Sequence, residues 1–489
     1  MTLTIIGAGP GGYETAVAAA AKGIEVNLVS FGPLGGTCLN EGCIPTKALC
    51  RAAEVYEDIR RAGEFGVSMP DGFNPGFDMK KAVERKDAVV DQLRGGIEFL
   101  MKNKLIHLYY GKASFKDAHT VLVEAENGEL TELVSDYIFI ATGSVSASLP
   151  IPGCDAKGVL TSREILTLTD IPKRLCVIGA GVIGLEFASI FTSLGSEVTV
   201  LEYCKDILPR FDTDLAKRLK QSLGKRGMTI ETAAQVQAIT EKGDSLQVKY
   251  MKKDKEFAVD ADKVLMAVGR RPAVSTLNLA DVGIEFSPKG IVTDANMRTS
   301  VPNIFAIGDV RGGMMLAHVA TFEGERALNT ILEEAAGNVP ACPLADGIRL
   351  DIVPACPLAD GIRLDIVPAA VFTVPEAAVV GRTEDDCKAE GIAVKCLKSF
   401  YRANGKAISM GEPDGYCKVV VADGDQKDAA GVEIKDRQIL GCHIFGAHSA
   451  DIVQEIAALM NFNATAESLA HIIHAHPTLS EVILTAVRQ

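Results

Sequence analysis

The sequence has no apolar run long enough to cross a membrane and no excess of positive charge. Its small-residue run Ala16–Ala21 is interrupted by Lys22 and Gly23, far short of the ~18 residues that a membrane span needs. The net charge is −13 at pH 7, and no basic stretch carries interleaved aromatic residues. These absences predict a soluble protein that binds neither membranes nor nucleic acid.

The sequence also lacks export signals and metal-binding motifs. It enters a strand directly at Leu3–Ile6, without a charged leader, an apolar leader core or an Arg-rich transit segment. None of the 12 cysteines belongs to a CxxC pair or to a Cys/His cluster with zinc spacing. We therefore expect a cytoplasmic protein without a metal site, unless a leader was removed before this numbering begins, with most cysteines as buried thiols.

What the sequence does contain is enough chain for about three domains. Its 489 residues are 47% hydrophobic and 23% charged, which is ordinary for a globular protein. The organisation along the chain therefore has to be inferred from motifs.

The first motif is a strand, a glycine-rich turn and a helix. A strand at Thr4–Ile6 leads into residues 7–12 (GAGPGG), a small-residue helix runs to about Lys22, and a second strand covers Val26–Ser30. Glycines at these positions permit a tight turn and bring the backbone close to a pyrophosphate, which then faces the helix N-terminus.

The same pattern occurs a second time. Strand Leu175–Ile178 leads into residues 179–184 (GAGVIG), then a helix, then strand Glu197–Glu202. Ser30 lies 23 residues after Gly7, and Glu202 lies 23 residues after Gly179. One such turn is a weak signal, but two copies with equal spacing predict two dinucleotide-binding units.

The remaining segments predict further β structure and a separate C-terminal α+β domain from about Val367. The expected strands and helices are Thr120–Glu124, Tyr137–Ala141, Val264–Val268, Ile304–Ile307, Cys417–Ala422, Gln438–Phe445, Ala450–Met460 and Ala466–Ile473.

A 14-residue segment is duplicated without a change. Residues 339–352 read VPACPLADGIRLDI, and residues 353–366 repeat them. Two copies are too few for a solenoid, and a longer loop adds little closure entropy. We interpret the duplication as a tolerated surface insertion without function, of recent or artefactual origin.

Residues 35–47 (GGTCLNEGCIPTK) carry two cysteines that are five residues apart. On a regular helix these cysteines would lie ~140° apart around the axis, whereas a disulfide needs Cα atoms within ~7 Å. The backbone must therefore leave the helical path if they pair, which Gly42 permits. The residues alone leave two interpretations open, a redox disulfide or two unrelated buried thiols.

This stretch closely resembles the redox-active loop of the FAD-dependent pyridine nucleotide-disulfide oxidoreductases. Residues 474–481 (HAHPTLSE) resemble the dihydrolipoamide dehydrogenase branch of that family in particular. The resemblance runs from residue 1 to the C-terminus, apart from the duplicated segment and a looser stretch near Asp423–Asp436.

The resemblance implies an α/β fold with two Rossmann-like nucleotide-binding domains plus a C-terminal α+β dimerisation domain. The expected division is a first part of the FAD-binding domain, an NAD-binding domain, a second part of the FAD/central domain, the insert or linker, and the dimerisation domain, at 1–145, 146–272, 273–338, 339–366 and 367–489.

The resemblance also assigns catalytic roles. Cys38 is expected to exchange with the substrate sulfur and Cys43 to form the charge-transfer thiolate beside the flavin. His476 is the expected base, oriented by Glu481, and it would reach the disulfide of the opposite subunit of an obligate homodimer. His474 is expected to be structural.

Lys47 and Glu186 match a pair beside the flavin, where a cation stabilises the reduced anionic ring. A surface ion pair is the alternative. Glu202 is expected to accept a hydrogen bond from a ribose 2′-OH and to repel a 2′-phosphate, which favours NAD over NADP. A plain solvated glutamate at a strand end is the alternative there.

The resemblance predicts contacts to two cofactors, FAD and NAD. Asp309 would accept a hydrogen bond from the FAD ribityl chain. Ser30 stands where the family usually has Glu; a serine can still form a hydrogen bond there, but without charge. The expected FAD residues are Gly7, Gly9, Gly12, Ser30, Gly36, Thr37, Lys47, Ala113, Thr142, Gly143, Gly308, Asp309 and Ala317. The expected NAD residues are Gly179, Gly181, Gly184, Glu202 and Gly269.

The function implied is oxidation of protein-bound dihydrolipoamide to lipoamide with reduction of NAD⁺. The carrier would be a lipoyl-bearing acyltransferase of a 2-oxoacid dehydrogenase complex or the glycine-cleavage carrier protein. One alternative is an NAD(P)H-dependent reductase of a small disulfide. Another is a mainly docking subunit with weakened turnover.

Overall fold

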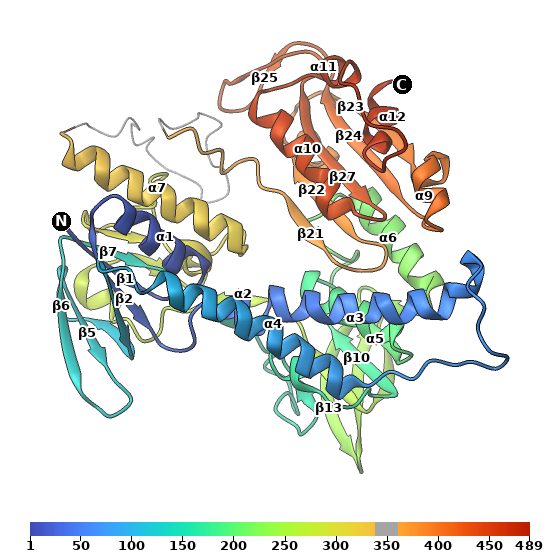
Figure 1. Cartoon of the computed structure of the whole chain (residues 1–489), viewed down its shortest axis with the longest axis horizontal. Helices are drawn as coiled ribbons and strands as arrows, with labels where there is room; N and C mark the ends of the chain where they lie inside the picture. The colour runs from blue at the N-terminus through green and yellow to red at the C-terminus, as the bar shows by residue number, and fades with distance from the viewer. Residues whose placement is uncertain (338–359) are drawn as a thin grey trace. The chain divides into compact units, whose positions relative to one another are not determined.

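The computed structural model describes residues 1–337 and 360–489, which form two compact units (Figure 1). Unit 1 comprises Met1–Pro45, Glu84–Ala147 and Arg270–Leu364. Unit 2 comprises Thr46–Val83, Ser148–Gly269 and Asp365–Gln489. Each unit thus collects segments that are far apart in the sequence.

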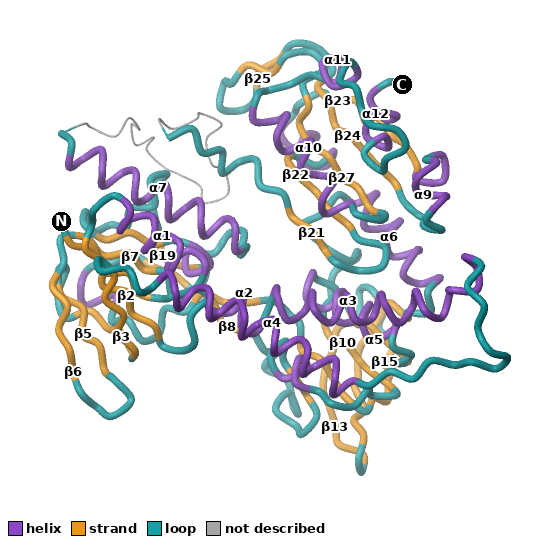
Figure 2. The backbone as a smooth tube through the Cα atoms, in the orientation of Figure 1, coloured by secondary structure: helices purple, strands orange, loops and turns teal. Residues whose placement is uncertain are grey.

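The centre of unit 1 is a parallel five-stranded sheet with strand order β20-β7-β1-β2-β3. Figure 2 draws its strands in orange. Its strands are β1 (Thr2–Ile6), β2 (Glu25–Ser30), β3 (Ile106–Tyr110), β7 (Tyr137–Ile140) and β20 (Ile304–Ala306). Leu3, Ile5 and Phe139 are fully buried, as expected of parallel strands that are covered on both faces.

Small residues let two helices of unit 1 pack closely. Helix α1 (Pro10–Ala21) lies against α7 (Ala317–Ala335) (Figure 1). A Cβ at Gly11 would lie 3.0 Å from the Ala320 carbonyl oxygen, and one at Gly324 would lie 2.0 Å from Thr15 Oγ1. The glycines are therefore needed for the helix contact itself.

Shorter elements complete unit 1. They are α2 (Gly36–Glu41), β4 (Lys112–Phe115), β5 (Thr120–Glu124), β6 (Leu130–Val134), β8 (Ser144–Ser146), β17 (Arg270–Pro272), η3 (Leu279–Val282), β18 (Phe286–Ser287), β19 (Gly290–Ile291) and η4 (Gly308–Arg311). β8 and β17 pair as a short antiparallel ribbon.

Unit 2 contains a second parallel sheet, with strand order β12-β11-β10-β16-β9. Its elements are β9 (Val159–Leu160), β10 (Arg174–Ile178), β11 (Glu197–Leu201), β12 (Thr229–Glu231), β16 (Lys263–Met266), with helices α5 (Val182–Ser193) and α6 (Thr213–Lys225) and the antiparallel strands β13 (Gln235–Lys242), β14 (Ser245–Lys252) and β15 (Lys255–Ala261). Two longer helices, α3 (Cys43–Arg61) and α4 (Met79–Leu100), begin in one unit and end in the other.

The C-terminal part of unit 2 is an antiparallel five-stranded sheet with order β21-β22-β27-β24-β23. Its elements are β21 (Ala369–Val371), β22 (Ala377–Gly381), α8 (Glu384–Glu390), β23 (Val394–Phe400), α9 (Gly405–Ser409), β24 (Tyr416–Ala422), β27 (Ile439–Phe445), α10 (Ser449–Asn461), α11 (Ala466–Ala470) and α12 (Glu481–Val487). Every residue of β24 and β27 is buried.

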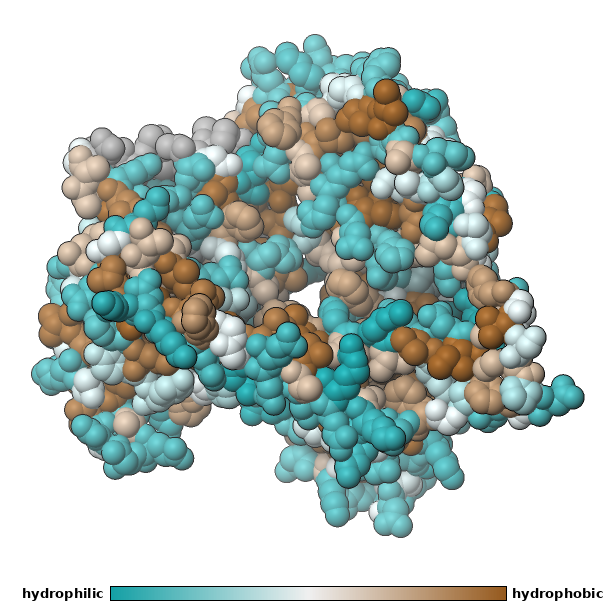
Figure 3. Space-filling view, in the orientation of Figure 1, coloured by the Kyte–Doolittle hydropathy of each residue, from teal (hydrophilic) through white to brown (hydrophobic). Residues whose placement is uncertain are grey.

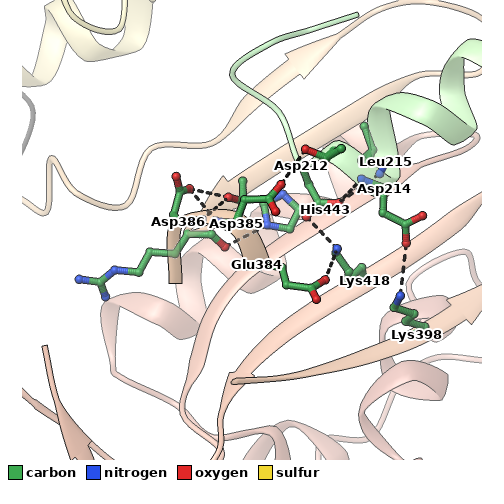
Figure 4. Close-up of polar contacts among 12 residues, drawn as sticks. Asp212, Asp214, Leu215, Glu384, Asp385, Asp386, Lys398, Lys418 and His443 are labelled. Carbon is green, nitrogen blue, oxygen red and sulfur yellow. Dashed lines mark hydrogen bonds and ion pairs between the residues drawn. The ribbon is translucent and has the colours of Figure 1, made fainter. Parts of the chain in front are cut away.

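Buried charges fasten α6 to this C-terminal sheet (Figure 4). Asp212 caps α6 through the backbone N–H groups of its first turn. Lys418 Nζ lies 2.8 Å from Asp212 Oδ2 and 2.9 Å from Glu384 Oε2. His443 Nε2 donates to the Arg382 carbonyl oxygen at 3.0 Å.

The predicted fold class is confirmed, with two parallel nucleotide-binding sheets and a C-terminal α+β domain. One predicted helix is too long, because Ala466–Ile473 ends at Ala470. The guanidinium of Arg488, the residue that follows α12, donates to the Ala470 carbonyl oxygen. Within residues 1–337 and 360–489, every helix is too short or too polar to cross a bilayer.

The first copy of the duplicated segment lies outside the described residues, whereas the end of the second copy is packed onto unit 1. The Arg326 side chain is 3% exposed, and its Nε lies 3.1 Å from Asp360 Oδ2. Arg326 also donates to the Ile362 carbonyl oxygen. Asp360 and Ile362 thus supply acceptors to a buried arginine, while Gly361 between them is exposed; the interpretation of the duplication as a tolerated insertion without function stays a prediction.

Candidate active site

The two cysteines of residues 35–47 lie on two helices that follow each other directly in the sequence. Cys38 is half-buried in α2, and Cys43 is exposed at the first position of α3. Gly42 separates the helices with φ −142° and ψ −110°, so the helical path is broken there. A Cβ at Gly42 would lie 3.0 Å from the Thr37 carbonyl oxygen, which explains why the break needs glycine.

Helix α2 is held in place by side chains that the sequence did not single out. Asn40 Nδ2 donates to the carbonyl oxygens of Leu34 and Gly36, both at 2.9 Å. Arg94 in turn donates to Asn40 Oδ1 at 2.8 and 3.0 Å. Since Cys38 belongs to this helix, the network fixes the orientation of the thiol-bearing turn.

The first glycine turn is tightly enclosed. Gly7 has φ +114°, and a Cβ there would lie 2.2 Å from the Ala141 carbonyl oxygen. A Cβ at Gly36 would lie 2.7 Å from the Gly9 Cα, so the start of α2 touches the turn. Ser30, buried at the end of β2, donates its hydroxyl to the Gly32 carbonyl oxygen at 2.8 Å.

The other predicted FAD residues of unit 1 are also fixed by neighbours. Thr142 Oγ1 donates to the Ala273 carbonyl oxygen at 2.8 Å, beside Gly143 with φ +72°. The Gly308 N–H donates to Glu323 at 2.6 Å, and Asp309 follows in η4. Burial raises the pKa of Glu323.

The remaining predicted FAD residues lie in regular elements. Ala113 lies in β4 and Ala317 begins α7. Of the predicted FAD residues, only Lys47 belongs to unit 2.

The second glycine turn is held by a buried carboxylate. Glu202 is 7% exposed; its Oε2 accepts from the Ala180 N–H at 2.6 Å and its Oε1 from the Cys204 N–H at 2.7 Å. It is thus not the solvated glutamate of the alternative interpretation. Gly179 has φ +105°, and an added Cβ at Gly184 would lie 2.0 Å from the Gly179 carbonyl oxygen.

Lys47 and Glu186 form an ion pair inside unit 2. Lys47 Nζ lies 2.9 Å from both carboxylate oxygens, and the Glu186 side chain is 5% exposed. Phe372 N–H donates to Glu186 Oε1 at 3.0 Å, and its ring lies 4.4 Å below the Lys47 ammonium. The pair is therefore not the surface contact of the alternative interpretation.

His476 presents one ring nitrogen to solvent and the other to a carboxylate. Its Nδ1 lies 2.9 Å from Glu481 Oε1, and its side chain is 80% exposed. Glu481 Oε2 accepts from the Thr478 N–H at 2.8 Å, and this bond together with His476 lowers the pKa of Glu481. Because the carboxylate only accepts, the ring donates from Nδ1, and in the neutral ring Nε2 is then the nitrogen that can accept a proton.

His474 has a different environment. Its side chain is 6% exposed, and Nε2 lies 2.8 Å from Glu455 Oε1. Ile473, the preceding residue, is 96% exposed, and Phe462 of the same domain is 83% exposed. Figure 3 shows hydrophobic residues on the surface of this domain.

Sequence reasoning missed two residues that contact Asp309. Ser144 donates to Asp309, and Arg270 donates to Ser144. The only sequence signal is adjacency, since Ser144 follows Gly143 and Arg270 follows Gly269.

Comparison with known proteins identifies the family. Residues 1–324 match the family model described as "Pyridine nucleotide-disulphide oxidoreductase", and residues 367–487 match that of its dimerisation domain. The chain belongs to the pyridine nucleotide-disulphide oxidoreductase family. Membership implies an FAD-containing enzyme that uses a nicotinamide nucleotide, and the dimerisation domain supports a homodimer.

The oxidoreductase is similar along its whole length to named proteins. A dihydrolipoyl dehydrogenase of Bacillus subtilis (strain 168) is 37% identical over 492 residues, covering 100% of this chain and 98% of that protein. Another, from Geobacillus stearothermophilus, is 38% identical over 483 residues, covering 99% and 94%. The HOCl-induced flavoprotein disulfide reductase RclA from Escherichia coli has a TM-score of 0.81 at 28% identity, covering 100% and 99%. The chain is therefore a flavoprotein disulfide oxidoreductase.

Proposed function

We propose that this oxidoreductase oxidises dihydrolipoyl groups carried by a partner protein and passes the electrons to NAD⁺. The observation that carries the proposal is the His476–Glu481 pair, in which an exposed imidazole is oriented by a carboxylate at 2.9 Å. Full-length identity of 37% to a dihydrolipoyl dehydrogenase supports it.

The residues around the first glycine turn fit FAD. The turn offers the N-terminus of α1 and a backbone without Cβ atoms at Gly9 and Gly36, which suits a pyrophosphate. Ser30 keeps acceptor lone pairs that could serve the adenosine ribose, and Asp309 would accept a hydrogen bond from the ribityl chain. When bound, FAD supplies two-electron transfer between a thiolate and a nicotinamide.

The thiol chemistry belongs to Cys38 and Cys43. A substrate thiolate attacks Cys38 of the Cys38–Cys43 disulfide, forming a mixed disulfide and releasing Cys43 as a thiolate. The second substrate thiolate then attacks the substrate sulfur of the mixed disulfide and releases Cys38. The substrate becomes a cyclic disulfide, and the cysteine pair holds the two electrons that finally reduce NAD⁺.

His476 manages the protons of these steps. Its Nε2 takes the proton from the first substrate thiol, releases it to solvent, and then takes the proton from the second, because only a thiolate is nucleophilic. Glu481 stabilises the imidazolium that forms and keeps the ring in the required tautomer. In the proposed homodimer, this base serves the disulfide of the partner subunit.

Two carboxylates of unit 2 serve the electron acceptor side. Glu186 holds the Lys47 ammonium, which would stabilise a reduced, anionic flavin. Glu202 would accept from a ribose 2′-OH and repel a 2′-phosphate, so we propose NAD rather than NADP. We propose the lipoyl-bearing acyltransferase of a 2-oxoacid dehydrogenase complex, or the glycine-cleavage carrier protein, as partner.

A second candidate is a reductase of a small disulfide driven by NAD(P)H. The observation that favours it is the TM-score of 0.81 with an enzyme named as a flavoprotein disulfide reductase. The same cysteine pair would then pass electrons to the substrate disulfide instead of accepting electrons from a substrate dithiol.

The deciding experiment is an anaerobic absorbance titration of the purified protein with dihydrolipoamide, followed by NAD⁺. We expect a flavin spectrum that gains a long-wavelength charge-transfer band and then yields NADH. No response to the dithiol, with turnover of NADPH and a small disulfide, would contradict the proposal in favour of the reductase. Absence of bound flavin from the purified protein would contradict both.

The base is tested with His476→Gln, which should lower dihydrolipoamide turnover by about 10²–10⁴-fold while flavin content is kept. The matched control is His471→Gln, since His471 is an exposed histidine five residues earlier. Equal turnover in both variants would contradict the assignment of His476.

A further inference from the structure

Three residues from remote parts of unit 1 form a chain of hydrogen bonds that ends on Asp309. Ser144 Oγ donates to Asp309 Oδ2 at 2.5 Å. Arg270 Nε donates to Ser144 Oγ at 2.7 Å, and an Arg270 terminal nitrogen donates to the Ser144 carbonyl oxygen at 2.7 Å. The Ser144 hydroxyl thus donates once and accepts once, which is its natural capacity.

The backbone builds this contact. Arg270 begins β17 and Ser144 begins β8, and the two strands pair antiparallel with Arg270 opposite Ser146 and Pro272 opposite Ser144. Just beyond the ribbon, the Ala273 N–H donates to the Gly143 carbonyl oxygen at 3.0 Å. The register therefore fixes the guanidinium over the Ser144 residue.

The network is shielded from solvent. The Arg270 side chain is 15% exposed and the Asp309 side chain 22% exposed, with Arg270 Nε 3.9 Å from Asp309 Oδ2. Ser144 is 9% exposed. At such sites a cation and a carboxylate interact more strongly than at the surface, because screening by water is reduced.

Arg270 also reaches the cysteine-bearing helix. A terminal nitrogen of Arg270 lies 3.4 Å from Thr37 Oγ1, and Thr37 immediately precedes Cys38 in α2. One guanidinium therefore contacts both the Asp309 network and the turn that carries the redox thiols.

We propose that Arg270 and Ser144 are positioning residues for the flavin, a role that rests on the proposed function. Ser144 fixes the rotamer of the Asp309 carboxylate, which would accept a hydrogen bond from the ribityl chain, and Arg270 balances the charge of that carboxylate. Arg270 also links Asp309 to α2, so that the position of the thiols relative to the ribityl site stays fixed. It also places a fixed cation at the flavin site of unit 1.

The test measures flavin retention in the full-length protein without any thiol or nicotinamide. Arg270→Met should raise the dissociation constant for FAD by about tenfold or more, the usual loss for a hydrogen bond to a charged group. Arg270→Lys should recover only part of this loss, because an ammonium cannot donate from the same fork. The matched control is Arg271→Met, since Arg271 is the exposed neighbour in the same strand.

Two further measurements separate positioning from general destabilisation. The flavin reduction potential of flavin-loaded Arg270→Met should become more negative, because the reduced anionic ring loses a cation, whereas Arg271→Met should leave it unchanged. Ser144→Ala should weaken FAD binding less than Arg270→Met, and the double variant should add little to Arg270→Met, since both side chains act through Asp309.

The proposal is overturned if Arg270→Met retains flavin as the unaltered protein does, or if Arg271→Met loses it equally. Fully additive losses in the double variant would overturn the relay through Ser144. These results are independent of lipoamide turnover, so failure of the proposed substrate would leave them standing. Absence of flavin in the unaltered protein would instead defeat the proposed function itself.

Discussion

The two glycine turns share one backbone plan but differ in what surrounds them. The Gly7 N–H donates to the Val29 carbonyl oxygen and the Gly179 N–H to the Leu201 carbonyl oxygen, both at 2.8 Å. In the first turn, a Cβ added at Gly9 would lie 3.9 Å from the Gly36 Cα. In the second turn, a Cβ added at Gly181 would meet nothing within 4 Å.

This difference matches the two kinds of cofactor that the family implies. An enclosed turn, contacted by the segment that carries the cysteines, suits a group that stays bound. An open turn suits a nucleotide that binds and leaves in each cycle. The same fold unit can therefore serve a resident cofactor or an exchanging one, according to what packs against its loop.

The ends of the neighbouring strands differ in the same sense. Ser30 is neutral and donates to the Gly32 carbonyl oxygen. Glu202 is charged and accepts two backbone N–H groups. The enclosed turn is thus supported by packing, whereas the open turn is supported by a carboxylate.

The largest effect is expected where a methyl group would enter the enclosed turn. Gly36→Ala places a Cβ 2.7 Å from the Gly9 Cα in a residue with φ +58°. Backbone cannot yield there, so we expect a loss of more than about 2 kcal/mol in stability, together with loss of flavin. Thermal unfolding and flavin absorbance measure the two consequences.

The matched change in the open turn is Gly181→Ala, at a residue with φ −77°. We expect stability to change by less than about 1 kcal/mol and flavin to be retained, while the KM for NAD⁺ rises. Equal loss of flavin in the two variants would contradict the distinction between enclosed and open turns.

An intermediate effect is expected at the strand ends. Glu202→Gln keeps one acceptor for two backbone donors and removes the charge, which should weaken NAD⁺ binding by about tenfold and reduce discrimination against NADP⁺. Ser30→Ala removes one neutral hydrogen bond, worth about 1 kcal/mol, and should leave NAD⁺ binding unchanged. Steady-state kinetics with both nucleotides and flavin release measure these effects; a larger change in NAD⁺ binding for Ser30→Ala would reverse the assignment.

Much of this arrangement could be predicted because it is local in sequence. The glycine turns, their flanking strands and the break at Gly42 all follow from residues a few positions apart. The contacts of His476 with Glu481 and of Lys47 with Glu186 are present as the resemblance implied, while their catalytic roles stay predictions, as do the NAD preference and the cytoplasmic location.

The remainder depends on tertiary structure. Ser144 and Asp309 are 165 residues apart, and no periodicity brings Arg270 to them. The last residue of α11, Ala470, likewise accepts a hydrogen bond from Arg488, which is 18 residues further along the chain. Glu202 was predicted as a ribose acceptor, but its use of both oxygens on backbone N–H groups required the turn geometry. Polar contacts between distant segments are the information that a single sequence lacks.

The smallest expected effect is the pH dependence of stability. It concerns a difference between the two units in how their helices are held. Small residues pack α1 against α7 in unit 1, whereas buried charges hold α6 in unit 2. Within that cluster, burial lowers the pKa of His443, and neighbouring Lys418 lowers it further, against the opposing effects of Asp212, Asp386 and the hydrogen bond to Arg382. Folded His443 is therefore neutral where unfolded His443 takes up a proton.

The sign of the resulting pH dependence follows from linkage. The contribution of neutral His443 to stability is complete above the unfolded value of ~6.5 and is lost as pH falls toward the lower folded value, with a slope of at most about 1.4 kcal/mol per pH unit. Burial opposes the charged form of Asp212, but Lys418 and the backbone N–H of Leu215 favour it and lower the pKa of Asp212. The contribution of Asp212 is therefore lost only below pH ~4. Urea midpoints between pH 5 and 8 should thus fall with acidity in the unaltered protein and fall less in His443→Gln, whose amide can still donate to the Arg382 carbonyl oxygen. The control is His107→Gln, at a histidine of unit 1 whose side chain is 43% exposed, and it should leave the dependence of the urea midpoint on pH unchanged. If this dependence is also unchanged in His443→Gln, the charge cluster does not set the acid sensitivity of unit 2.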